Sequence, residues 1–150
     1  MGWVTFAVLL AAPLADRLQA EDACVTAQGR TTCTWGPFQR TLAAAQTIRA
    51  DYSERDKMTG SQLKDMIKKL GKQVAKDGEA ADLTVTIQPA VLTGVDIGPA
   101  DEEILELRIY NGNNTQQLVW VETYVGQKDR PWPANVNSAI QQFLHRLPKK

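Results

Sequence analysis

The sequence predicts an α+β fold, namely a two-layer α/β sandwich in which two helices cover one face of a mostly antiparallel sheet, with a disulfide-closed hairpin on the N-terminal side. Two patterns predict it. Apolar residues recur with helical spacing in two segments, and in other segments they alternate with polar residues, as they do along strands buried on one face. Helices with one apolar stripe and a half-buried sheet must hide these surfaces against each other, which gives two layers.

The size and composition fit one globular domain. The chain has 150 residues, of which 43% are hydrophobic and 23% are charged, and its formal net charge is zero. A neutral chain lacks the basic field that binds nucleic acid, so no nucleic-acid partner is expected. We expect a single α/β domain over residues 21–150, in which residues 21–38 form a hairpin extension.

The first twenty residues have the pattern of a secretory signal peptide. An almost unbroken apolar run from Trp3 to Ala15 is followed by a small residue, Ala20, and then by two acidic residues. The run is shorter than the roughly 20 apolar residues that span a bilayer, so cleavage after Ala20 and no stable membrane span are expected. The alternative is a buried or amphipathic N-terminal helix.

The two cysteines, Cys24 and Cys33, enclose a segment with the composition of a β-hairpin. Gln28 and Gly29 stand at its centre between threonine-rich flanks, and Gly29 can adopt the positive φ of a tight turn. In an exported chain such a pair is normally oxidised, which predicts a structural disulfide. A metal-binding pair or a redox couple is the alternative, but the chain has no CxxC motif and a single distant histidine.

The next elements are a strand and a helix. The Trp-Gly-Pro-Phe sequence at 35–38 interrupts the pattern, and a strand is expected within residues 42–52. Helical periodicity then begins, with Thr59 or Ser61 as the expected N-cap and Gly78 as the expected left-handed end. Its apolar face consists of Leu63, Met66, Ile67, Leu70 and Val74.

Three strands and a second helix complete the predicted order. Alternating or β-prone residues predict strands over 82–88, 104–110 and 116–125, with a loop at 93–100. Asn111 and Gly112 predict a type I′ turn between the last two strands, because both central residues of that turn need a positive φ. After a polar connection at 128–133, the closing helix is expected over residues 134–147.

No residue pattern predicts a catalytic, metal or cofactor site. A catalytic group needs a partner that tunes it, and His145, at the end of the last helix, has no sequence signal for one. Asn113-Asn114-Thr115 has the form of a glycosylation sequon, although the turn already explains these residues. We therefore expect no catalytic residue, metal or cofactor.

Two groups of residues are the candidates for contact with a ligand or partner. Large aromatic side chains in loops can stack on sugars or anchor an interface, and acids around a glycine-proline loop can face a ligand. The alternative is that the tryptophans cover the ends of the sheet and the acids are solvated, while Trp120 lies in the core. The candidates are Trp35, Trp132, Asp96, Asp101, Glu102 and Glu103.

From Thr47 onward the pattern resembles small Gram-negative envelope families of unassigned function. The residues that carry it are the helix at 63–74, the strand entry Ala80-Ala81-Asp82-Leu83-Thr84-Val85, the hairpin at 110–120 and the closing helix. These families are built on the α/β domain also found at the amino terminus of TolB and in LpoB and CsgG. The resemblance implies a non-enzymatic periplasmic accessory or scaffold domain.

The predicted function is therefore that of an exported, non-enzymatic accessory or interaction protein of the bacterial envelope, located in the periplasm or secreted. Its expected partner is an envelope protein or assembly. The second hypothesis is a module that uses its loop tryptophans to bind a glycan or another small ligand, and the third is an uncharacterised hydrolase. The sequence does not indicate an oligomeric state.

Overall fold

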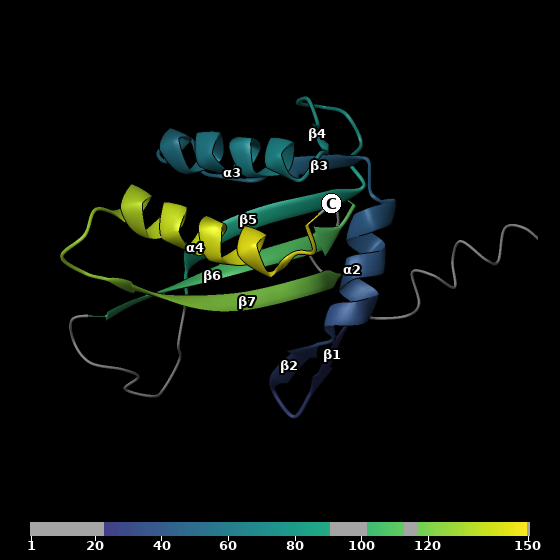
Figure 1. The fold of residues 1–150 in the computed structure, drawn as a ribbon, viewed down its shortest axis with the longest axis horizontal. Coiled ribbons are helices and arrows are strands. Elements are labelled where there is room, and N and C mark those ends of the chain that lie inside the picture. Colours follow the sequence, from purple (N-terminus) through teal and green to yellow (C-terminus); the bar gives the residue numbers. More distant parts are fainter. Residues whose placement is uncertain (1–22, 91–101, 113–116, 150) are drawn as a thin grey trace, which may run out of the picture.

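The fold is an α+β sandwich with an additional disulfide-closed hairpin, as the sequence predicts. The computed structural model describes residues 23–90, 102–112 and 117–149. Helices α3 and α4 lie side by side over one face of the sheet, and α2 crosses the end of the sheet beside the hairpin (Figure 1). The elements are β1 (Cys24–Ala27), β2 (Arg30–Cys33), α2 (Trp35–Ala44), β3 (Thr47–Ala50), α3 (Lys57–Lys69), β4 (Gln73–Val74), β5 (Leu83–Pro89), β6 (Glu102–Asn111), β7 (Leu118–Gln127) and α4 (Trp132–Arg146).

The main sheet has the strand order β4-β3-β5-β6-β7 and mixed strand directions. The long ladders β5–β6 and β6–β7 are antiparallel. Strand β3 instead runs parallel to both β4 and β5, because α3 carries the chain back across the sheet between β3 and β4. The sheet is therefore antiparallel in its long strands and parallel at its short edge.

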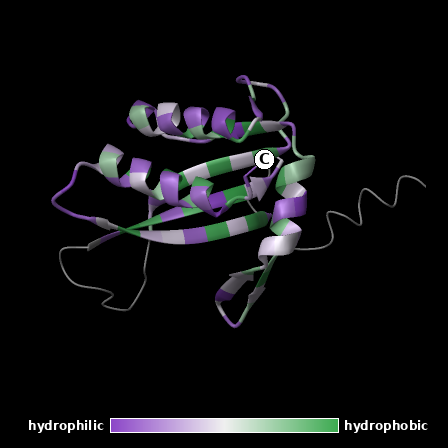
Figure 2. Ribbon diagram, viewed as in Figure 1, coloured by the Kyte–Doolittle hydropathy of each residue, from purple (hydrophilic) through white to green (hydrophobic). Residues whose placement is uncertain are grey.

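The core lies between the sheet and the helices. Leu83, Val85 and Ile87 of β5 are buried, as are Leu105, Leu107 and Ile109 on β6, which confirms the alternation expected for both strands. Figure 2 shows hydrophobic residues alternating with more polar ones along these strands. Phe143 and Val136 of α4 and Leu63 of α3 fill the space above them and are fully buried.

The N-terminal hairpin and its disulfide are confirmed. Strands β1 and β2 pair antiparallel with Cys24 opposite Cys33, and the two sulfurs are bonded. Both central residues of the turn have a positive φ, 53° at Gln28 and 76° at Gly29, as a type I′ turn requires. The sequence pattern was thus sufficient to place this turn.

Helix α2 was not predicted, since residues 35–38 were expected to be irregular and residues 42–52 to hold a strand. The helix covers Trp35–Ala44, and the strand is confined to Thr47–Ala50. Proline is tolerated in a first helical turn because the backbone N–H groups there need no helical partner, so Pro37 does not end the helix. Phe38 and Leu42, four residues apart, are the face that it buries.

Helix α3 begins and ends earlier than predicted. Its N-cap is Asp56, not Thr59 or Ser61, because the Asp56 carboxylate accepts a hydrogen bond from the backbone N–H of Thr59 at 3.2 Å. Its end is set by Gly71, which has a φ of 78°, and not by Gly78. The chain beyond Gly71 then pairs with β3 as strand β4, so Val74 belongs to the sheet.

The hairpin between β6 and β7 is confirmed, but its expected type I′ turn is not formed by Asn111 and Gly112. Asn111 is the last residue of β6, and of these two residues only Gly112 has a positive φ, 58°. The backbone N–H of Asn111 donates to the carbonyl of Gln117 at 2.9 Å, so the connection is longer than two residues.

Helix α4 was predicted over 134–147 and covers Trp132–Arg146, with Pro133 in its first turn. Several predictions fall outside the described residues: the signal peptide at 1–20, the loop at 93–100 with Asp96, the candidate contact residue Asp101, and the sequon at 113–115.

Candidate functional site

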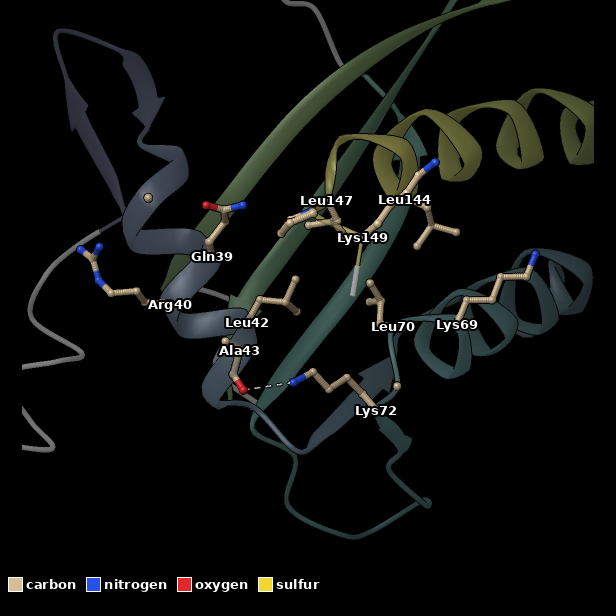
Figure 3. Close-up of a pocket in the computed structure, with 13 residues that line it drawn as sticks. Gln39, Arg40, Leu42, Ala43, Lys69, Leu70, Lys72, Leu144, Leu147 and Lys149 are labelled. Atoms are coloured by element: carbon tan, nitrogen blue, oxygen red, sulfur yellow. Dashed lines mark hydrogen bonds between the residues drawn. The ribbon is translucent and has the colours of Figure 1, made fainter.

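A pocket of about 860 Å³ lies where the ends of the three helices approach one another (Figure 3). This volume is within the range of roughly 300–1,000 Å³ that is usual for small-molecule sites. Its lining comes from α2, from the C-terminal ends of α3 and α4, and from the segments that follow those two helices. The residues are Gly36, Gln39, Arg40, Leu42, Ala43, Lys69, Leu70, Gly71, Lys72, Leu144, Leu147, Pro148 and Lys149.

The interior of the pocket is apolar. Leu42, Leu70, Leu144 and Leu147 point into the space between the helices in Figure 3 and pack against the hydrophobic core. They come from three different elements, so the pocket exists only when all three helices are in place. The side chains of these leucines have no hydrogen-bonding groups, and they therefore provide an apolar contact surface for a ligand.

Local sequence features place each wall. Gly36, Gln39, Arg40 and Ala43 share one face of α2, because residues three, four and seven apart line up along a helix. Gly71 ends α3 through its positive φ and turns the chain so that Leu70 and Lys72 reach the pocket. Pro148 directly follows the C-cap of α4, where proline cannot continue the helix.

The charged residues of the lining are all cations: Arg40, Lys69, Lys72 and Lys149. The Lys72 ammonium donates to the carbonyl of Ala43 at 3.2 Å, which ties the end of α3 to the end of α2. Arg40 extends away from the cavity in Figure 3. None of the lining residues carries a carboxylate side chain, so the charged side chains of the lining are all positive.

A carboxylate with an altered pKa lies close to this rim but is bound elsewhere. Asp82 accepts backbone hydrogen bonds from Gln46 at 2.8 Å and from Thr47 at 3.2 Å. These bonds, with a smaller contribution from the charge of Lys72, hold the pKa of Asp82 below its ordinary value of 3.8. Asp82 thus fixes the start of β3 and is not part of the pocket lining.

Trp35, one of the predicted contact residues, lies at the start of α2 and packs against other aromatic rings. Its ring centroid is 4.9 Å from that of Trp120, in edge-to-face geometry. The Arg146 guanidinium lies 4.6 Å from the Trp35 centroid and pairs with Glu122. Trp120 is 5% exposed, which confirms its expected place in the core. Trp35 therefore joins α2 to β7 and α4.

Trp132, the second predicted tryptophan, is the first residue of α4 and is also engaged in the scaffold. Its indole N–H donates to the carboxylate of Asp56 at 3.2 Å and to the hydroxyl of Thr59 at 3.0 Å. The indole thereby joins the N-terminal ends of α3 and α4.

Glu103 contacts Asn135, which is 1% exposed. The Asn135 amide donates to the Glu103 carboxylate and to the carbonyl of Gln127, each at 2.8 Å, and its oxygen accepts from the Gln127 backbone N–H at 3.2 Å. A Cβ at Gly126 would lie 2.6 Å from the Asn135 side chain, so glycine is needed there. Glu103 therefore holds the β7–α4 connection.

The structure places Trp35 and Glu103, two of the predicted contact residues, far apart. Trp120, beside Trp35, and Gly126, opposite Glu103, are six residues apart on β7, which at about 3.4 Å per residue is roughly 20 Å. Glu102 begins β6, its side chain lying outside the described residues, as do Asp96 and Asp101. Sequence reasoning missed the pocket, because its first wall is the unpredicted helix α2. The spacing of Phe38 and Leu42 was the one sequence signal for helix α2, and it did not indicate the pocket.

The described residues contain neither a metal-ligating cluster nor a helix that could span a membrane. Among residues 23–90, 102–112 and 117–149, no group of three or more metal-ligating side chains is close enough to hold an ion. In these ranges, no helix has the length and hydropathy needed to cross a membrane.

Comparisons with known proteins found partial structural likeness only. No protein family matches the chain, and no curated protein is similar to it. A minor lipoprotein from Acinetobacter baumannii has a TM-score of 0.40 and 14% identity, over 70% of this chain and 98% of that chain. A Xanthomonas campestris protein of family DUF330 has a TM-score of 0.34 and 14% identity, over 65% of this chain and 75% of that chain. Scores this low carry no argument, and the resemblance to TolB, LpoB and CsgG domains stays a prediction.

Proposed function

We propose that this chain is an exported, non-enzymatic accessory protein of the bacterial envelope that works by binding a small apolar ligand in the three-helix pocket. The observation that carries the proposal is the pocket itself, of about 860 Å³, with leucines from three elements facing inward. A concave apolar site of this size, with a few polar groups at its margin, is the usual form of a small-molecule site.

Export is supported by the cysteines. The Cys24–Cys33 bond closes a surface hairpin, and such bonds persist in oxidising compartments. The apolar run before Ala20 agrees with this location. Intact mass of the protein from its native host tests it: we expect a chain that starts at Glu21 and gains two hydrogens on reduction. An uncut, reduced chain would contradict export.

Ligand binding is tested with the neutral fluorescent probe N-phenyl-naphthylamine. We expect its emission to rise on addition of the protein and the rise to be lost in Leu147→Trp, because the larger ring fills the pocket. Gln141→Trp, an exposed substitution on the same helix, is the matched control and keeps the signal. Equal binding by both variants would place the probe elsewhere and refute the proposal.

The non-enzymatic part of the proposal has its own test. Ligands that co-purify with the protein from envelope extracts are identified by mass spectrometry after long incubation at 25 °C or above. We expect each ligand to be recovered unchanged. A product that accumulates with wild-type protein but not with Leu147→Trp would show that the pocket catalyses a reaction.

The edge strand β7 favours a second function, in which an extended segment of an envelope protein pairs with it. Among the described strands, β7 is paired on one side only, and Val125 on it is 61% exposed. The part of this ten-residue strand that the hairpin and α2 do not contact is a template for strand addition. In pull-down from envelope extracts, we expect wild type and the control Gln141→Lys to retain a bound envelope protein and Val125→Lys to lose it. Retention by Val125→Lys would refute this function.

A further inference from the structure

We infer that the ligand of this pocket is a single-chain anionic amphiphile, with an acyl chain among the leucines and an anionic head group at Lys69, Lys72 and Lys149. The inference rests on the proposed function and names the chemical class that the site would bind. The lining separates apolar side chains in its interior from charged side chains at its rim.

The interior selects an apolar chain. Leu42, Leu70, Leu144 and Leu147 are the inward-pointing side chains of Figure 3. A sugar or another polar ligand would lose its hydrogen bonds to water there and find no replacement among these leucines, which is costly. Each methylene group that moves from water into such a surface contributes favourably to binding. The interior therefore favours an acyl chain over a glycan.

The helix ends explain why the charge belongs at the rim. Helices α3 and α4 both present their C-terminal ends to the pocket, and these ends carry partial negative charge of about half an elementary charge each. A compact anion deep in the pocket would be repelled by them. An anion at the mouth instead meets lysines that follow or end these helices, Lys69 and Lys72 beside α3 and Lys149 beyond α4.

The same residues determine the sign of the charge on the ligand's head group. Full positive charges on the lysines outweigh the partial charges of the helix ends, so a cationic head group is disfavoured. A neutral amphiphile would gain the apolar contact but no attraction at the rim. An anionic head group joined to one apolar chain satisfies both regions at once.

The experiment compares two ligands with the same chain and fluorophore, dansyl-undecanoic acid and its uncharged methyl ester, which carries one additional methyl group. We expect the acid to bind wild-type protein about tenfold more tightly than the ester, because two or three partly exposed charge contacts supply that difference. In Lys69→Gln/Lys149→Gln, we expect the preference to fall to about threefold or less, while binding of the ester is unchanged.

A control variant separates the local effect from overall charge. Lys57→Gln/Lys128→Gln removes the same charge from exposed lysines outside the pocket lining, and we expect it to keep the full preference for the acid. Equal loss of preference in both double variants would mean that general attraction is responsible and would overturn the inference.

The outcomes also separate this inference from the proposed function. If acid and ester bind wild-type protein equally and both are lost in Leu147→Trp, the pocket binds a ligand but the inference is wrong. If neither ligand binds, the proposed function fails together with it. Displacement of bound acid by decanoate or by decyl phosphate supports the class, and because their alkyl chains are of nearly equal length, the stronger competitor identifies whether the preferred head group is a carboxylate or a phosphate.

Discussion

Asn135→Ala should destabilise the protein strongly, and its energetic coupling to Glu103 should show that this acid is structural. Asn135 is 1% exposed and makes three hydrogen bonds, to the Glu103 carboxylate and to both backbone groups of Gln127. Alanine removes all three and takes the acceptor from the backbone N–H of Gln127, whereas the Gln127 carbonyl still accepts from the backbone N–H of Arg130 at 3.1 Å.

The magnitude follows from these bonds. Each neutral hydrogen bond contributes about 1 kcal/mol net, and the bond to the charged carboxylate contributes about 1.5–3 kcal/mol. Glu103 is partly exposed and can recover some hydration, so we expect a total loss of about 3–4 kcal/mol in the free energy of unfolding. That is a large fraction of the roughly 5–15 kcal/mol of a typical domain.

The assay is urea unfolding followed by tryptophan fluorescence. Asn137→Ala is the matched control, because Asn137 is exposed on the same helix, and we expect its effect to stay within about 0.5 kcal/mol. Glu103→Ala and the double variant complete a thermodynamic cycle, in which we expect a coupling of about 1–2 kcal/mol between Asn135 and Glu103.

Additive effects of Asn135→Ala and Glu103→Ala would refute this reasoning, since independent sites add within about 0.5 kcal/mol. A Glu103→Ala variant with unchanged stability would likewise show that the carboxylate has no structural role. Glu103 would then again be a candidate for ligand contact.

Three other perturbations have clear expected results. Reduction of the Cys24–Cys33 bond, which spans a sequence separation of 9, should lower the free energy of unfolding by about 2–3 kcal/mol in chemical denaturation, because it restores chain entropy to the unfolded state. Trp132→Phe should cost about 1–2 kcal/mol in the same assay, through loss of the indole bonds to Asp56 and Thr59. The pKa of Asp82 is lower in the folded state than its ordinary 3.8, so its stabilising effect should be complete above that value and be lost as the pH falls through the folded pKa. Thermal unfolding of Asp82→Asn should accordingly depend less on pH in acid than that of wild type.

Each of these expectations has an opposing result. Equal stability of the oxidised and reduced proteins would mean that the hairpin unfolds independently of the rest. An unchanged free energy of unfolding in Trp132→Phe would show that the indole bonds to Asp56 and Thr59 do not stabilise the contact between α3 and α4. Parallel pH curves for wild type and Asp82→Asn would show that the backbone hydrogen bonds of this carboxylate do not affect stability.

Local patterns in the sequence were sufficient for the parts of the fold that depend on neighbouring residues. The turn at Gln28 and Gly29 follows from the φ values that these positions need, and it brings Cys24 opposite Cys33. The buried strand of Leu83, Val85 and Ile87 follows from alternation, since successive side chains of a strand point to opposite faces. The resulting two-layer fold was therefore predictable from the chain.

Tertiary contacts decided the parts in which local signals compete. Pro37 and Gly36 favour an irregular segment, but α2 forms because Phe38 gains complete burial against Trp120 and Phe143. Whether Val74 continued α3 or paired with β3 depended on Gly71 and on a strand distant in sequence. The contacts of Trp35 with Arg146 and of Glu103 with Asn135 likewise join segments that are distant in sequence.

The candidate site is decided entirely by tertiary contacts. Its walls come from segments around residues 36–43, 69–72 and 144–149, and no spacing within any one of them indicates a cavity. A pocket is the space that remains when separate elements pack against a shared core, so its position depends on the packing distances between those elements. The sequence by itself determined the longer strands, the closed hairpin and helices α3 and α4, whereas helix α2, strand β4 and the pocket were decided by burial and pairing across the fold.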